Sequence, residues 1–191
     1  MDLHKLGFKF HASGFEQFDL LELIPVYHRW IQQHALSDLL IDVADYTHVP
    51  EGPGVLLVAH EGNYGLDETD GKRGVVYYSK HPLEGDLATR LATVARKALQ
   101  AGKLLTDEPA VAGALRLNGV VQFFANDRLA APNTDETYAA LEPAVRSLFD
   151  KLFAGAPYTL ERQTDPKERF GLTATVQAPV TVDALLERVA A

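Results

Sequence analysis

The polar run that follows the apolar segment 55–59 holds the residue types best suited to chemistry in this chain. It brings an imidazole, a carboxylate, an amide and a phenol together in His60, Glu61, Asn63 and Tyr64, with glycines that would let a ligand approach the backbone. Because imidazole titrates near neutral pH, His60 could serve as a general base while Glu61 orients or protonates a substrate. The simpler alternative is that His60 is a hydrogen-bonded histidine at a strand end and that the following residues form a polar turn.

Two aspartates in the preceding strand candidate, Asp42 and Asp45, would be carried towards this run by a hairpin. If the turn is centred on the segment 50–53, Val43 lies opposite His60, and Asp42 lies opposite the glutamate that follows it. The predicted ligand-binding residues are therefore Asp42, Asp45, His48, His60, Glu61, Asn63 and Tyr64.

Histidines are confined to the first 81 residues, at positions 4, 11, 28, 34, 48, 60 and 81. None forms a His-x-His or His-x-x-x-His pair, so we expect no bound metal, and the sequence indicates no particular cofactor. The chain has no cysteine, which excludes disulfides, thiolate nucleophiles and cysteine-ligated clusters. It also lacks a P-loop, a Gly-x-Gly-x-x-Gly fingerprint and a Gly-x-Ser-x-Gly elbow.

The run from His60 to Tyr64 resembles the histidine motif of the lipid A late acyltransferases, in which a glycine, an asparagine and an aromatic residue follow the histidine. That motif continues with a catalytic glutamate. Gly65 stands at the corresponding position of this chain, so the carboxylate that would pair with the histidine is missing. We therefore do not expect acyltransferase activity.

The elements that must position these residues recur along the chain. Two helical segments, Leu20–His34 and Thr134–Phe153, carry a proline at matching positions, and an aromatic strand candidate precedes each. Both halves indicate the order strand–helix–strand–strand–helix, with an extra strand at 75–78 in the first half. We expect Asp19, either Asn133 or Thr134, and Thr181 to cap helices.

Helices separated from antiparallel hairpins are typical of the α+β class. The preferred arrangement is two tandem units with a ferredoxin-like topology of the dimeric α/β-barrel type and an antiparallel sheet. A hot-dog-like sheet around one long helix is the alternative. The expected boundaries are a first unit at 1–105, a linker at 106–118 and a second unit at 119–191, forming one compact domain.

Composition narrows the class of protein. With 47% hydrophobic residues, the chain can bury a sizeable core. A net charge of −8 without a basic patch argues against nucleic-acid and acidic-membrane partners. The first residues do not resemble a signal peptide, and no apolar run is long enough to span a membrane, so we expect a cytoplasmic protein.

Three functions are compatible with these observations. The first is a non-catalytic accessory or interaction protein, and the second is a small-ligand-binding protein. The alternative is a hydrolytic or metal-assisted enzyme that uses His60 with Glu61 or Asp45. The sequence leaves a protein partner, a small-molecule ligand and a homo-oligomer all open.

Overall fold

The computed structural model describes residues 3–14, 18–111, 113 and 115–190. Within them, one antiparallel sheet has the strand order β2-β3-β4-β5-β1-β6-β8-β7. The strands are β1 (Leu6–Ser13), β2 (Leu40–Asp45), β3 (Val55–Ala59), β4 (Gly62–Asp67), β5 (Gly74–Ser79), β6 (Arg116–Ala125), β7 (Tyr158–Arg162) and β8 (Gly171–Val176).

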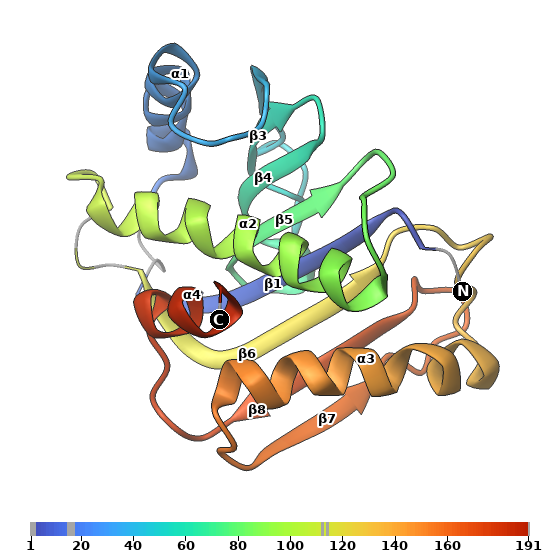
Figure 1. Ribbon diagram of the computed structural model, residues 1–191. Coiled ribbons are helices and arrows are strands. Elements are labelled where there is room, and N and C mark those ends of the chain that lie inside the picture. The colour runs from blue at the N-terminus through green and yellow to red at the C-terminus, as the bar shows by residue number, and fades with distance from the viewer. Residues whose placement is uncertain (1–2, 15–17, 112, 114, 191) are drawn as a thin grey trace.

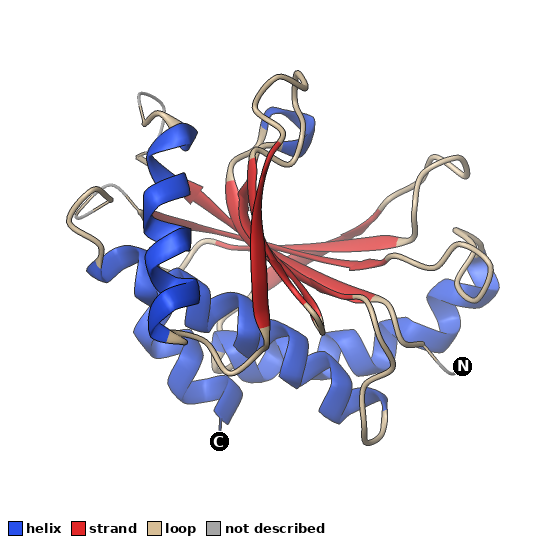
Figure 2. Cartoon of the chain, turned by 90° about the horizontal axis from the view of Figure 1, so that it is seen from above, coloured by secondary structure: helices blue, strands red, loops and turns tan. Residues whose placement is uncertain are grey.

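The longer helices gather on one side of this twisted sheet (Figures 1 and 2). Helix α2 packs on β1 and β5, α3 contacts β8, α4 contacts α2 and α3, and α1 lies beside β2. The helices are α1 (Leu23–Gln33), α2 (Leu87–Asp107), α3 (Asp135–Phe153) and α4 (Val182–Ala190), with single turns η1 (Leu20–Glu22) and η2 (Thr69–Gly71). Loops and η2 border the other face of the sheet, which we call the open face.

Side-chain caps fix the helix starts that the sequence predicts. The Asp19 carboxylate accepts a hydrogen bond from the N–H of Leu21, and Thr134 caps α3. The Thr181 hydroxyl accepts from the N–H of Ala184 at 3.2 Å. These bonds satisfy backbone donors that have no partner inside a helix. The predicted caps Asp19 and Thr181 are confirmed, and of the two candidates for α3 the structure selects Thr134 and not Asn133.

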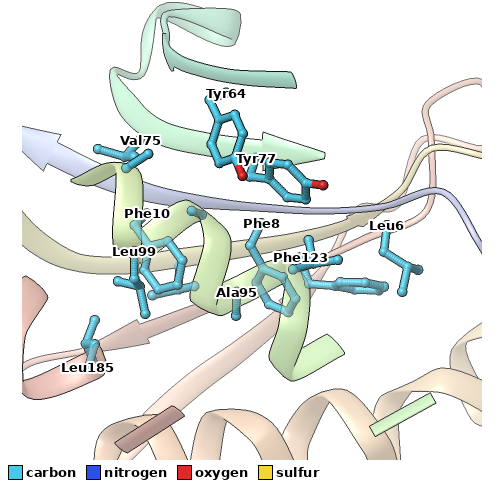
Figure 3. Packing of buried hydrophobic residues seen from close by; sticks show 14 of the residues in the cluster. Leu6, Phe8, Phe10, Tyr64, Val75, Tyr77, Ala95, Leu99, Phe123 and Leu185 are labelled. Carbon is cyan, nitrogen blue, oxygen red and sulfur yellow. The ribbon is translucent and has the colours of Figure 1, made fainter. Parts of the chain in front are cut away.

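The hydrophobic core lies between the sheet and the helices. Alternate residues of β1 point into it, and the rings of Phe8 and Phe123 lie 5.4 Å apart between centroids. Figure 3 shows Phe8, Phe10 and Phe123 in this core together with Ala95 and Leu99 of α2. Because successive side chains of a strand point to opposite faces, the remaining residues of β1 must project onto the open face.

The α+β class and the single antiparallel sheet are confirmed. The sheet is not a closed barrel, since β2 and β7 form its two edges. The ferredoxin-like duplication is not confirmed and stays a prediction. In the first half, four strands (β2 to β5) follow α1, whereas the sequence predicts three.

Strand β4 is the element that sequence reasoning missed, because its residues were expected to form the polar turn after His60. Its glycines and Asn63 have low strand propensity, which hides it in the sequence. In the structure, β3 and β5 pair with it on both sides, and this pairing overrides local preference.

No helix within the described ranges is both long enough and apolar enough to cross a membrane.

Candidate functional site

The hairpin formed by β2 and β3 does not have the predicted register. Val43 lies opposite Leu57 instead of His60. For the same reason, Asp42 does not lie opposite Glu61. The connecting loop is centred earlier in the chain than the proline–glycine segment suggests, and a bulge interrupts β2. The expected juxtaposition of these side chains is therefore wrong.

The acidic candidates of this hairpin and His48 make local contacts at the surface. The Asp45 carboxylate accepts hydrogen bonds from the N–H and hydroxyl of Thr47 at 2.8 and 2.7 Å, and these bonds lower the pKa of Asp45. Asp42 accepts from the next backbone N–H at 2.8 Å. The exposed His48 stacks on Tyr46. Such contacts stabilise a turn and do not converge on one point.

His60 and Glu61 lie at one end of the hairpin. The exposed imidazole of His60 stacks on that of His81, with ring centroids 4.7 Å apart. The Glu61 carboxylate accepts a hydrogen bond from the backbone N–H of Leu39 at 2.9 Å. The glutamate therefore holds the start of β2, and the histidine is left on the surface.

Tyr64 points to the face of the sheet that the helices cover, where its ring lies in the core beside Tyr77 (Figure 3). Its hydroxyl donates to the buried carboxylate of Asp38 at 2.8 Å, and Asp38 also pairs with Lys97. Burial, followed by the charge of Asp38, raises the pKa of Tyr64. Asn63 lies on the open face, where its amide donates to the hydroxyl of Tyr78 at 2.9 Å.

The seven predicted residues are thus not gathered into one site. The described part of the open face instead carries a groove made of two adjoining hollows, of about 900 and 440 Å³. Thr69, Asp70 and Gln122 line both hollows. We call the combined space the open-face groove. Its floor is formed by the central strands β1, β5, β6 and β8, and its walls by η2 and the loop 163–169.

Lys9 lies at the centre of this floor, opposite Val76 of β5 and Gln122 of β6. Its ammonium group is buried, with the residue only 2% exposed, and forms an ion pair with Asp67. It also donates to the carbonyl oxygen of Thr69 at 3.2 Å. Desolvation lowers the pKa of Lys9 against the opposing effect of Asp67. Burying both charges is costly, and such a pair does little for stability by itself.

His11 lies two residues further along β1, on the same face as Lys9. It is 7% exposed, and its Nε2 atom is buried without a hydrogen-bond partner in the described structure. Burial, together with the charges of Lys9 and Lys72, lowers the pKa of His11 to about 4, so the ring is neutral at pH 7. An unsatisfied buried polar atom costs about 1–3 kcal/mol, which is rarely tolerated without a reason.

Arg169 covers the other hollow. Its guanidinium carbon lies 3.7 Å from the ring centroid of Phe124, and the group donates no hydrogen bond to any of the described residues. Burial lowers the pKa of Arg169. Gly7 makes this stacking possible, because a side chain at that position would overlap the ring of Phe124.

A signal for part of this site is present in the sequence. In the strand candidate Phe8-Lys9-Phe10-His11, ionisable residues alternate with aromatic residues. In a central strand this pattern places a charge and an imidazole on the face opposite the core. No group of three or more histidine, aspartate or glutamate side chains within the described ranges is arranged to hold a metal.

Comparison of the chain with protein-family models, curated proteins and solved structures gives no match. The function of the groove is therefore inferred from its own residues.

Proposed function

We propose that this protein binds a small polar molecule in the open-face groove, where Lys9, His11 and Gln122 contact it. The observation that carries the proposal is the buried, unpartnered Nε2 atom of His11 beside a hollow of about 900 Å³. Because this atom is buried, a ligand reaches it when the imidazole turns towards the groove, and the hydrogen bond then removes the cost of leaving the atom unsatisfied.

The residues around His11 supply further polar groups in one row. Lys9, Gln122, Thr173 and Glu161 lie directly opposite one another on β1, β6, β8 and β7. Directly opposed residues of antiparallel strands project to the same face. The row offers an amide and a hydroxyl to a ligand, and it lies on the side of the sheet away from the helices. If the residues of this row served only to stabilise the sheet, hydrophobic residues of similar size would do so at least as well.

Binding fits His11 better than acid–base catalysis. A general base works best when its pKa lies near the working pH, and the pKa of His11 is about 4. A neutral imidazole at pH 7 is a good hydrogen-bonding group but a weak proton acceptor.

A protein partner at the edge of the sheet is the second candidate function. Leu39, which directly precedes β2, is 60% exposed, and Ile41 near the start of β2 is 55% exposed. Strand β2 has a free edge, which a partner strand would pair with. Strand β2 also contains a bulge and aspartates, and both features disfavour pairing of an edge strand with another chain. This candidate therefore ranks second.

The internal duplication remains part of the proposal. It is supported by the central position of β1 and β6, which are antiparallel neighbours and the first strands of their halves. The two halves share the order of their elements but not their strand order, because β6 pairs directly with β8 whereas β5 and β4 lie between β1 and β3.

Ligand binding is tested by a thermal-shift screen of the protein against a panel of polar metabolites, because a ligand of the native state raises the midpoint of unfolding. Compounds that stabilise the wild type are tested again on His11→Gln and on His28→Gln, whose histidine is exposed on α1. We expect H11Q to lose the response and H28Q to keep it. Amide NMR shifts that lie only outside the groove, or a response that H11Q retains in full, would overturn the proposal.

A further inference from the structure

We infer that the ligand of the open-face groove is a monocarboxylate with an apolar body, and that its carboxylate binds the guanidinium group of Arg169. The inference rests on the proposed function and names the chemical class of the ligand. It follows from three features of the hollow of about 440 Å³ next to the His11 region.

The first feature is the orientation of Arg169. One face of its guanidinium plane is covered by the ring of Phe124, and the group forms no hydrogen bond among the described residues. Stacking on an aromatic ring fixes the plane and leaves the N–H donors at its edge available. A planar guanidinium group held in one orientation can donate two parallel hydrogen bonds to a carboxylate.

The second feature is the charge around Arg169. The carboxylates of Asp67, Asp70 and Glu168 act on its guanidinium, and Lys9 already neutralises Asp67. These acids offset the charges of Arg169 and of Arg128, which lines the same hollow, so a carboxylate is held by the N–H donors of Arg169 and not by a surplus of positive charge. They oppose a dianion such as a phosphate monoester, because its second charge would meet like charges at short range.

The third feature is the apolar surface in the same hollow. Pro53 and the ring of Tyr78 line it, and Asn63 holds the hydroxyl of Tyr78. Ligand sites commonly combine apolar walls with a few polar groups that fix orientation. A body that contacts Tyr78 also lies near Gln122, which lines both hollows and leads towards His11.

The probe for this inference is 3-phenylpropanoate, compared with its amide and with phenyl phosphate in isothermal titration calorimetry at constant ionic strength. We expect the carboxylate to bind at least tenfold more tightly than either of the other two compounds. Arg169→Gln should weaken its binding at least tenfold, and Arg169→Lys should restore only part of the loss. Arg96→Gln, which removes an exposed arginine on α2, should leave binding unchanged.

The outcomes separate this inference from the proposed function. If the amide or the phosphate binds as well as the carboxylate, or if R169Q binds the carboxylate like the wild type, the carboxylate inference is wrong. If 3-phenylpropanoate does not bind while neutral metabolites still shift groove amides in NMR spectra, the inference fails and the proposed function stands. If neither the probe nor any metabolite shifts these signals, both fail. Circular dichroism of R169Q confirms that the variant is folded.

Discussion

Lys9 and Asp67 form a buried ion pair on the face of the sheet opposite the helices. The two residues are 58 positions apart in the chain and come from β1 and the end of β4. The Asp67 carboxylate also accepts from the hydroxyl of Thr69 at 2.7 Å, so the pair is tied to the wall of the groove. This pair makes the centre of the open-face groove polar.

Replacing one partner of the pair should destabilise the fold strongly. In Lys9→Met, the Asp67 carboxylate stays buried without its counter-charge, and we expect a loss of about 3–5 kcal/mol in the free energy of unfolding. Urea denaturation measures it. The double variant Lys9→Met/Asp67→Leu should recover most of the loss, while Lys5→Met, at an exposed position, should change stability by less than about 0.5 kcal/mol. Losses that simply add in the double variant would mean that the charges are not coupled.

The pH dependence of stability should report the burial of His11. Its pKa is about 4 in the folded protein, against 6.5 for the free group, because burial and the charges of Lys9 and Lys72 outweigh Asp67 and Asp70. The unfolded chain therefore binds more protons between these values. The stabilising contribution is complete above pH 6.5 and is lost as the pH falls towards 4, up to about 3 kcal/mol.

Comparison with variants isolates this effect. The unfolding free energy of His11→Gln should fall less than that of the wild type between pH 6.5 and 4, whereas the exposed-site variant His28→Gln should follow the wild type. NMR titration of the His11 ring gives its pKa directly. A value near 6.5 would show that the ring is solvated and not buried in the groove.

Removing the hydroxyl of Tyr64 should affect stability and not ligand binding. Tyr64→Phe leaves Asp38 with Lys97 but takes away a buried hydrogen bond of 2.8 Å, at a cost of about 1–2 kcal/mol. Denaturant unfolding measures the cost, and titration with a compound from the thermal-shift screen measures binding. A variant that folds normally but no longer binds the compound would show that the ligand site lies around Tyr64.

A variant of His60 distinguishes the predicted run around His60 from the open-face groove as the ligand site. It is exposed and contacts His81, so His60→Gln should change the unfolding free energy by less than about 0.5 kcal/mol. Binding in the groove should be unaffected. If H60Q abolishes binding while H11Q keeps it, the site lies at the predicted run and not on the open face.

Much of the fold could be predicted because local patterns decide it. The apolar run of β3 and the capping residues Asp19, Thr134 and Thr181 each indicate their element within a few residues. Strand β4 could not be predicted in this way, because only its pairing with two neighbours makes a segment with two glycines extended.

The groove could not be predicted because long-range pairing assembles it. Lys9 and His11 belong to the first strand, Gln122 to β6 and Arg169 to a loop before β8. Only the strand order places β1 between β5 and β6 and brings these residues together. The polar residues of the run around His60 are adjacent in sequence, but adjacent residues of a strand point to opposite faces, so the run does not form one site.

The central claim is that the open-face groove is a ligand site, and crystallographic fragment soaking tests it most directly. Crystals of the wild-type protein are soaked with a library of polar fragments that includes 3-phenylpropanoate. We predict fragment density in the groove with a polar atom within hydrogen-bond distance of the Nε2 atom of His11. Fragments that bind only around His60 and His81, with nothing but solvent in the groove, would contradict the claim.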